Sequence, residues 1–266
     1  MKRRISVGCA WQFVIAFAAV LMGPGLVLAQ ISSPLTGYYV GLGDSVAAGT
    51  GALPGTNGYV YRLYEGGVFG RRQETAFSNA AIRGARSWEL RDHQVPQVLC
   101  AEPDQRPTVV TITAGANDLL REDFDPVAIA GRVAGAVDLL LNNPLPVLDP
   151  VTGLPCRAIE DVTILVSNYY SIPHPDPVVF GLLDTLLQGF DQALRFWLAG
   201  VPVPAGSRVA IVDLYTPSVG RQGLVMLERR LGFPGPGPFD FDPHPTNLGH
   251  AFIAGEFAKV WQALED

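Results

Sequence analysis

The amino-acid sequence predicts an α/β protein, a three-layer α/β/α sandwich around a five-stranded parallel sheet. Five short apolar runs are the expected strands, at about residues 38–43, 75–79, 108–114, 161–167 and 207–213. They lack strict alternation of apolar and polar residues, which is typical of strands buried on both faces. Amphipathic stretches with helical spacing separate the runs. This alternation favours parallel strands joined by right-handed helical crossovers.

Capping residues mark the ends of the expected helices. Asp125 and Pro126 form a good N-cap and first-position pair, and apolar residues then recur at helical spacing over residues 127–141. Residues 179–198 form a long amphipathic run. Thr246 is expected to cap the last helix of the chain.

The first 29 residues have the pattern of a secretory signal. Lys2-Arg3-Arg4 precedes an apolar run centred on residues 14–21, and Val27-Leu28-Ala29 offers a cleavage site before Gln30. An N-terminal membrane anchor is the alternative, but Gly23-Pro24-Gly25 breaks the run short of the roughly 20 residues that span a bilayer. We therefore expect a signal peptide at 1–29, one folded domain at 30–266, and a protein that is secreted, periplasmic or at the cell surface.

The charge balance excludes one class of partner. The chain has 19 basic and 25 acidic residues, and the expected signal peptide holds three of the basic ones and no acidic one. The remaining 237 residues then carry 16 basic and 25 acidic side chains, a formal net charge of −9. No basic cluster is left that could neutralise a phosphate backbone, so we expect no nucleic-acid partner. The sequence leaves the oligomeric state open.

Two cysteines remain after the signal peptide, Cys100 and Cys156. An even number of cysteines in an exported chain predicts one disulfide. Each precedes an apolar strand-like run, so both are expected at the amino edge of the sheet. Two unrelated buried thiols are the alternative. No metal site is expected, because neither cysteine has a histidine or a second cysteine at ligand spacing.

Small or polar residues follow the first three expected strands. Ser45 follows the first, Gly84 lies shortly after the second, and Asn117 follows the third. Because ligands bind at the carboxyl edge of open α/β sheets, we expect these residues to converge there. Small residues after Ser45 allow a tight turn into a helix, whose N-terminus would favour developing negative charge. The Asn117 amide and the Gly84 backbone N–H are candidate oxyanion donors, with a turn cap and a positive φ as their plainer roles.

His244 is the candidate general base, because carboxylates lie close before it and a helix start lies just after it. His174, after the fourth strand, is its rival. His93 is expected to be exposed, and His250 to pack or cap within the last helix.

The imidazole of His244 needs an acceptor for its Nδ1–H. Asp242 is nearest in sequence, although Pro243 between them stiffens the backbone and could point the carboxylate away. Asp240 has more freedom, and a backbone carbonyl is the third possibility.

Three loops are rich in proline and glycine, at residues 49–58, 143–155 and 232–238. The first and third flank the serine and histidine segments. They are candidate walls of a substrate cleft, with plain surface connections as the alternative.

Four motifs in this order resemble those of the SGNH hydrolase superfamily, also called GDSL esterases and lipases. They are Gly43-Asp44-Ser45, the stretch from Asn79 to Gly84, Gly115-Ala116-Asn117-Asp118, and His244-Pro245-Thr246 with Gly249-His250 following. The resemblance covers Tyr38 to Leu264 and implies that residues 30–266 form a hydrolase domain with a flavodoxin-like sheet. One position departs from the pattern: the family's usual aspartate, three residues before the histidine, is Phe241 here.

The resemblance implies a serine esterase or lipase. Ser45 would be the nucleophile, His244 the base and then acid, and Asp242 or Asp240 its orienting partner. The oxyanion would be held by the N–H groups of Ser45 and Gly84 and the amide of Asn117. No cofactor or metal is implied. The ester is a small molecule, a lipid or an acetylated sugar, and transfer of the acyl group to an acceptor other than water stays open.

Two other classes compete with this interpretation. A catalytically inactive module that binds carbohydrate or a partner could use the same fold. A metallophosphoesterase would also gather Asp44, Asn117 and His244 at strand ends, but normally needs more metal ligands than the early strands supply.

Overall fold

The computed structural model describes residues 37–121, 124–174, 176–221, 223–224 and 242–266. Five parallel strands form one sheet in the order β2-β1-β3-β4-β5. They are β1 (Gly37–Gly43), β2 (Thr75–Asn79), β3 (Val109–Thr113), β4 (Thr163–Ser167) and β5 (Arg208–Val212). Their bounds lie within two residues of those expected from the apolar runs. The strand order is flavodoxin-like, as expected.

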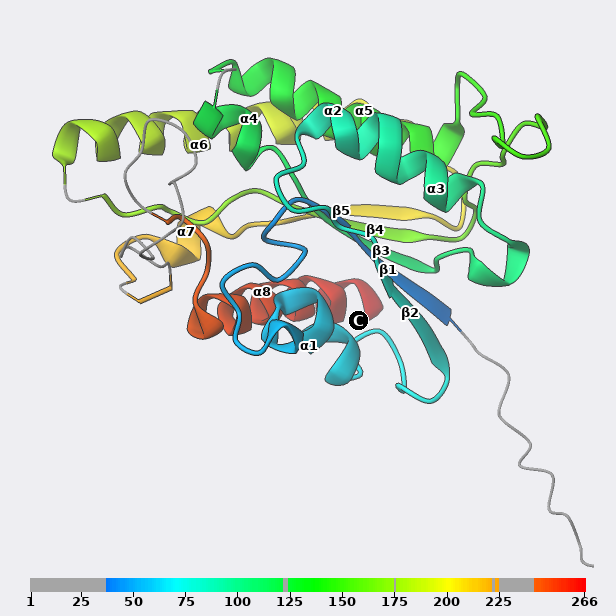
Figure 1. Ribbon diagram of the computed structural model, residues 1–266, viewed down its shortest axis with the longest axis horizontal. Coiled ribbons are helices and arrows are strands. Elements are labelled where there is room, and N and C mark those ends of the chain that lie inside the picture. The colour runs from blue at the N-terminus through cyan, green and yellow to red at the C-terminus, as the bar shows by residue number, and fades with distance from the viewer. Residues whose placement is uncertain (1–36, 122–123, 175, 222, 225–241) are drawn as a thin grey trace, which may run out of the picture. The chain divides into compact units, whose positions relative to one another are not determined.

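Helices cover both faces of the sheet (Figure 1). On one face lie α2 (Ser87–Glu89), α3 (Val95–Leu99), α4 (Ala116–Arg121), α5 (Pro126–Asn142) and α6 (Pro177–Ala199). On the other lie α1 (Tyr59–Glu65) and α8 (Asn247–Glu265), and α7 (Tyr215–Ser218) follows β5. A π-helical segment, Leu90–Gln94, joins α2 to α3, and two short 3₁₀ turns are Gly55–Asn57 and Pro103–Gln105. The predicted three-layer sandwich is confirmed.

The register of the strands brings the motif residues to one edge. Gly43 at the end of β1 pairs with Thr113 at the end of β3, and Gly41 pairs with Asn79 at the end of β2. Since all five strands are parallel, the segments that follow them start from the same edge. In Figure 1 this carboxyl edge lies at the left.

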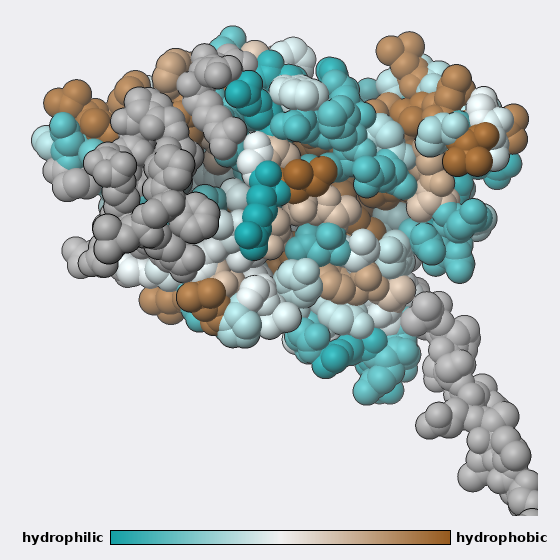
Figure 2. Space-filling view, in the orientation of Figure 1, coloured by the Kyte–Doolittle hydropathy of each residue, from teal (hydrophilic) through white to brown (hydrophobic). Residues whose placement is uncertain are grey.

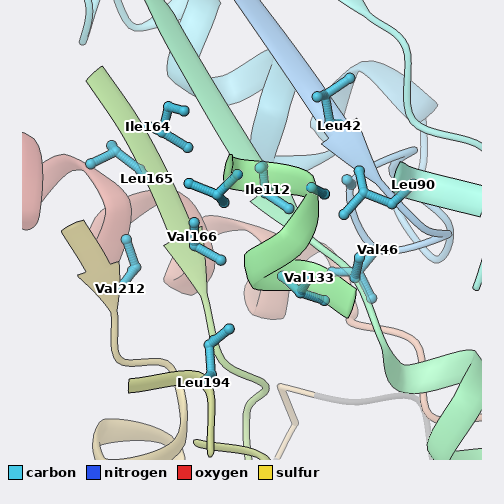
Figure 3. Close-up of a cluster of buried hydrophobic side chains, with 14 of the residues drawn as sticks. Leu42, Val46, Leu90, Ile112, Val133, Ile164, Leu165, Val166, Leu194 and Val212 are labelled. Atoms are coloured by element: carbon cyan, nitrogen blue, oxygen red, sulfur yellow. The ribbon is translucent and has the colours of Figure 1, made fainter. Parts of the chain in front are cut away.

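The core consists mainly of aliphatic residues, with some buried aromatic ones, on both faces of the sheet, as a doubly covered parallel sheet requires. Figure 3 shows Leu42, Ile112, Ile164, Leu165, Val166 and Val212 from four strands, with Leu90, Val133 and Leu194 from helical segments that cover one face. Val133 is 1% exposed and the other side chains of this set are 0% exposed. Burying a side chain of this size stabilises the fold by roughly 1.5–3 kcal/mol. The strands therefore form a fixed platform for the loops at the carboxyl edge.

The predicted helix caps are present. The Asp125 carboxylate accepts hydrogen bonds from the backbone N–H groups of Val127 and Ala128 at the start of α5. The Thr246 hydroxyl accepts one from Gly249 in the first turn of α8. Each such cap stabilises its helix by roughly 1 kcal/mol. At α8 the cap also fixes where the segment carrying His244 ends.

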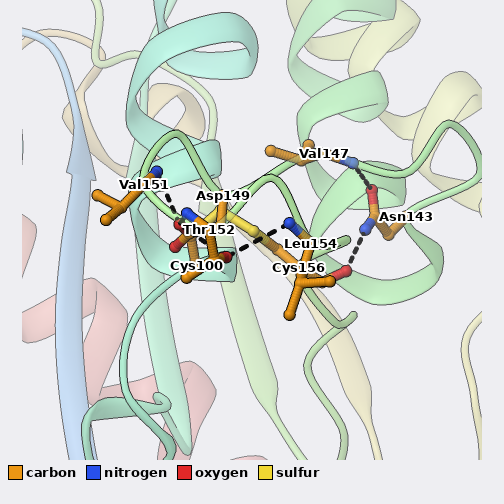
Figure 4. The surroundings of a disulfide bond; sticks show 8 residues. All are labelled: Cys100, Asn143, Val147, Asp149, Val151, Thr152, Leu154 and Cys156. Atoms are coloured by element: carbon orange, nitrogen blue, oxygen red, sulfur yellow. Dashed lines mark hydrogen bonds between the residues drawn. A yellow bond between two sulfur atoms is a disulfide. The ribbon is translucent and has the colours of Figure 1, made fainter.

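Cys100 and Cys156 form the predicted disulfide (Figure 4). Cys100 follows α3, and Cys156 closes the loop that follows α5, so the bond joins two segments that precede β3 and β4. The Asn143 side chain holds the same loop, since its amide donates to the Cys156 carbonyl at 2.8 Å. The bond therefore lies at the amino edge of the sheet.

That disulfide-tied loop carries exposed aliphatic side chains, Leu145, Leu148, Val151 and Leu154. Brown surface gathers at the upper right of Figure 2, where Figure 1 has the loop between α5 and β4. None of the helices within the described ranges combines the length and the apolar character needed to cross a bilayer.

Three predictions lie outside the described residues. They are the signal peptide at 1–29, the role of Asp240, and the loop at 232–238.

Candidate active site

Ser45 lies two residues after the end of β1, on a turn that only glycine can begin. Gly43 has φ +129°, and a Cβ at that position would lie 2.0 Å from the Thr113 carbonyl oxygen. The next residue, Asp44, donates its N–H to the same carbonyl at 2.9 Å. The close approach of β1 and β3 therefore fixes the point from which Ser45 projects.

The expected helix after Ser45 is wrong. A single helical turn forms, in which the Ala48 N–H bonds to the Asp44 carbonyl at 2.9 Å, and the chain then leaves it. Gly49 and Gly51 take φ values of +80° and +95°, which an α-helix cannot contain. The first long helix on this side, α1, begins only at Tyr59.

Ser45, His244 and Asp242 form one hydrogen-bonded chain. The Ser45 Oγ lies 2.8 Å from His244 Nε2, and His244 Nδ1 lies 2.5 Å from an Asp242 carboxylate oxygen. Ser45 and His244 are 199 residues apart in sequence, and they meet because His244 precedes α8 at the carboxyl edge. The structure thus brings together the serine, histidine and carboxylate that the sequence singled out.

Pro243 does not turn the Asp242 carboxylate away. The same carboxylate oxygen that meets the imidazole also accepts the His244 backbone N–H at 3.0 Å, which is an Asx turn across Pro243. The fixed φ of proline suits this turn. The carboxylate two residues before His244 therefore reaches the imidazole without the family's usual spacing.

Asn117 and Gly84 belong to adjacent parts of the same edge. Asn117 stands in the first turn of α4, and its side-chain amide donates to the Ala85 carbonyl at 3.0 Å. Gly84, directly before Ala85, has φ +79°. An amide nitrogen carries two N–H donors, so one is bound to Ala85 and the other is available to a ligand.

Asp118 links the start of α4, where Asn117 lies, to the segment that follows Gly84. Its carboxylate accepts the Ser87 N–H at 2.8 Å and the Ser87 hydroxyl at 2.7 Å, at the start of α2. Arg132 of α5 completes the cluster, with its Nε 2.8 Å from the Ser87 hydroxyl. Asp118 thus satisfies the N-terminal end of a neighbouring helix, α2.

Asp44 is fully buried between the motif residues Gly43 and Ser45. Its carboxylate accepts the Val46 N–H at 2.9 Å and the hydroxyl of Tyr169. Burial raises the pKa of the Asp44 carboxyl to about 6 from its ordinary value of 3.8, while these two hydrogen bonds pull the pKa down. The carboxylate therefore fixes the turn that bears Ser45 and has no access to solvent.

A small pocket opens beside Ser45 and His244. Its volume is about 20 Å³, and it is lined by Ser45, Val46, Ala116, Asn117, Leu120, Tyr169, Tyr170, Ile172, Pro243 and His244. The loop at 49–58 does not line this pocket. It supports α8 instead, because a Cβ at Gly51 would lie 2.2 Å from the Pro245 carbonyl oxygen.

Two buried side chains that support the site were not identified from the sequence. Gln94, in the π-helical segment, accepts the Gly43 N–H and donates to the Gly43 carbonyl, both at 2.8 Å. Tyr170 donates its hydroxyl to the Pro243 carbonyl at 2.9 Å. The only sequence pattern that could indicate Gln94 is a polar residue at a helix position that is otherwise expected to be apolar.

The other histidines have local roles. His250 is buried in α8, where Nε2 lies 3.0 Å from the Thr50 carbonyl oxygen and Nδ1 accepts the Tyr59 N–H at 3.3 Å. Burial lowers its pKa to about 4. His93 is exposed, and His174 Nδ1 accepts the Asp176 N–H at 3.0 Å. It is His244, and not His174, that meets Ser45.

Among the described residues, one group of candidate metal ligands lies close together: Cys100, Asp149 and Cys156. The two sulfur atoms are bonded to each other and so offer no thiolate to an ion.

A serine, a histidine and a carboxylate in this hydrogen-bonded order are the parts of a serine hydrolase. Residues 42–252 match the GDSL-like lipase/acylhydrolase family, and the chain belongs to that family. Its enzyme class is therefore carboxylic ester hydrolase. No curated protein sequence matches the chain.

Solved structures with the same fold include several esterases. A member of the lipolytic G-D-S-L family from Veillonella parvula has a TM-score of 0.55 at 16% identity, over 85% of this chain and 98% of its own. A carbohydrate esterase family 3 protein from Talaromyces cellulolyticus has a TM-score of 0.54 at 15% identity, over 86% and 99%. A lipase from a goat rumen metagenome has a TM-score of 0.52 at 17% identity, over 84% and 97%. At these identities the likeness establishes the fold.

Proposed function

We propose that this protein is a secreted esterase or lipase that hydrolyses carboxylic esters through an acyl intermediate on Ser45. The observation that carries the proposal is the continuous chain of hydrogen bonds from Asp242 through His244 to the Ser45 hydroxyl. Nothing in a purely structural role requires a solvent-reachable serine and histidine to be aligned in this way.

In the first half of the reaction, Ser45 Oγ attacks the ester carbonyl while His244 Nε2 takes its proton. The alcohol leaves with that proton, and the acyl group stays on Ser45. In the second half, His244 takes a proton from water, the hydroxide attacks the acyl carbonyl, and Ser45 Oγ regains the proton as the acid departs. Asp242 holds the imidazole in the tautomer that has Nε2 available.

The oxyanion of each tetrahedral intermediate needs fixed donors. We assign this role to the backbone N–H groups of Ser45 and Gly84 and to the side-chain amide of Asn117. The positive φ of Gly84 and the bond from Asn117 to the Ala85 carbonyl support the assignment, because they hold both donors in one short segment. Loss of one such donor typically lowers kcat by roughly 10²–10³. No metal or organic cofactor takes part in these steps.

Export is the second part of the proposal. The signal pattern at residues 1–29 supports it, and so does the disulfide between Cys100 and Cys156, because such bonds persist in oxidising compartments.

The two competing classes make different demands on the site. A metallophosphoesterase would use Asp44 as a ligand, but this carboxylate is fully buried and bonded to Val46 and Tyr169. An inactive binding module would have no use for the aligned Ser45 and His244.

The experiment is hydrolysis of p-nitrophenyl acetate by the purified protein, with EDTA and without. We expect turnover that EDTA does not affect and that Ser45→Ala abolishes. Turnover of bis-p-nitrophenyl phosphate that EDTA abolishes would point to the metal enzyme. Binding of a carbohydrate with no turnover of any ester would point to the inactive module.

A further inference from the structure

The pocket beside Ser45 is small. A cavity needs roughly 10–15 Å³ by the same measure to hold one water molecule, so a volume of about 20 Å³ has room for one or two groups of that size. A methyl group is close to a water molecule in size. The methyl of an acetyl group therefore fits inside, whereas the further methylenes of a longer chain would lie outside this volume.

Apart from Ser45, Asn117 and His244, the residues that line the pocket present apolar groups to it, although two of them are tyrosines. The Tyr169 hydroxyl bonds to the Asp44 carboxylate, and the Tyr170 hydroxyl bonds to the Pro243 carbonyl. Burial raises the pKa of both phenols well above the usual value, so both stay protonated as donors to these partners. With the hydroxyls engaged elsewhere, the rings join Leu120 and Ile172 in presenting carbon to a ligand.

The walls are also held in place. Tyr169, Tyr170 and Ile172 lie within five residues of the end of β4 and are 1%, 3% and 4% exposed. Besides the two tyrosine hydroxyl bonds, the Ser171 N–H donates to the Ser218 hydroxyl at 2.7 Å. Widening the pocket would therefore break buried hydrogen bonds and leave their polar groups unsatisfied, which is unfavourable.

The acyl group is the part of an ester that such a pocket suits. It stays attached to Ser45 through both halves of the reaction, so the protein must house it, whereas the alcohol leaves and water must replace it. A polar alcohol such as a sugar would need hydrogen-bond partners besides Ser45, Asn117 and His244, which the reaction itself engages, and the other walls present carbon.

We infer that this pocket receives the acyl group and restricts the enzyme to esters of acetic acid and acids little longer, with Tyr170 and Ile172 as the residues that set the limit. This inference rests on the proposed function.

The test is kcat/KM for p-nitrophenyl acetate, propionate, butyrate, hexanoate and octanoate. A misfit methylene in an apolar pocket costs roughly 10–200-fold, so we expect kcat/KM to fall at least tenfold from acetate to butyrate and further beyond it. A fall of less than tenfold would overturn the inference and leave the esterase function standing. Failure to cleave any ester of the series would overturn the proposed function, and the inference with it.

A second series separates the two halves of the substrate. Acetate esters of ethanol, butanol and octanol are compared by the acetate released, and we expect kcat/KM to vary less than tenfold among them. A steep dependence on the alcohol together with a flat dependence on the acyl chain would assign the pocket to the alcohol.

Variants test the walls themselves. Ile172→Ala enlarges the pocket without removing a hydrogen bond, and should raise the ratio of butyrate to acetate kcat/KM at least tenfold. Ile172→Val, which removes only one methyl group, gives a smaller rise and guards against a failure of Ile172→Ala to fold. Tyr170→Phe keeps the ring and should keep the ratio near wild type, while Leu154→Ala, on the far edge, is the control for handling. An unchanged ratio in both Ile172 variants would contradict the inference.

Discussion

The carboxylate of Asp242 accepts two hydrogen bonds from His244, one from its backbone N–H at 3.0 Å and one from its imidazole Nδ1 at 2.5 Å. The first bond fixes the carboxylate, and the second fixes the imidazole. A carboxylate two residues before the histidine can thus do what the family's usual position, three residues before, does elsewhere.

Asp242→Asn should lower kcat by roughly four orders of magnitude while the fold persists, because an amide can stabilise the wrong imidazole tautomer. The measurement is kcat on p-nitrophenyl acetate, with circular dichroism to check the fold. Asp240→Asn is the matched control and should stay near wild type. If Asp240→Asn were the inactive variant and Asp242→Asn the active one, the assignment of the orienting carboxylate would be wrong.

Gln94→Ala should destabilise the protein by about 1–3 kcal/mol, because the buried Gly43 N–H loses its acceptor. Because Gly43 lies two residues before Ser45, kcat should fall as well. The free energy of unfolding in urea measures the first effect. Gln97→Ala, at an exposed position three residues further along the same segment, should stay within about 0.5 kcal/mol of wild type. Equal stability of the two variants would show that the Gln94 side chain does not stabilise the turn at Gly43.

The free energy of unfolding should depend on pH because of the buried Asp44 carboxyl. Its folded pKa of about 6 lies above its ordinary value of 3.8, so the folded state binds this proton more tightly. The stability that the protonated Asp44 carboxyl contributes to the folded state is complete below pH 4. It is lost as the pH rises to 6 and above, where the ionised carboxylate stays buried.

Asp44→Asn removes that titration. The unfolding free energy of the variant minus that of wild type should increase by roughly 2–3 kcal/mol as the pH rises from 4 to 7. Urea unfolding of both proteins at several pH values measures the difference. A difference independent of pH would mean that Asp44 titrates normally in the folded protein.

Replacing both cysteines by serine should cost roughly 2–5 kcal/mol of stability, because the disulfide closes a loop of 56 residues in the unfolded chain. The bond lies at the amino edge of the sheet, so kcat should change less than about twofold. Melting temperature with and without reductant tests this, and only the wild type should respond to reductant. A large loss of kcat in a folded variant would show that the two edges are coupled.

The strands and the main site residues could be predicted because each depends on local sequence. A strand buried on both faces is a short apolar run wherever it occurs, and Ser45, Asn117 and His244 follow or precede such elements directly. The caps Asp125 and Thr246 are local in the same way.

What the sequence did not reveal depends on contacts between distant segments. The Gln94 bond to Gly43 spans 51 residues, and the Tyr169 bond to Asp44 spans 125. No periodicity marks such pairs. The helix expected after Ser45 does not form because Gly49 and Gly51 take positive φ. Gly49 lies against Gly55 and Gly58, and Gly51 lies against the Pro245 carbonyl, which again is a tertiary contact.

The carboxylate that orients His244 could be predicted only in part from local sequence. Nearness to His244 favours Asp242, but the direction of its carboxylate depends on whether Pro243 favours or opposes an Asx turn. The structure shows that it favours one.

The central claim is that Ser45 becomes acylated, and covalent labelling tests it most directly. A fluorophosphonate probe should add one label per chain, measured by intact mass, and peptide mapping should place that label on Ser45. Ser45→Ala should take up none. Labelling that persists unchanged in Ser45→Ala, or an active wild-type enzyme that takes up no label at all, would contradict the account.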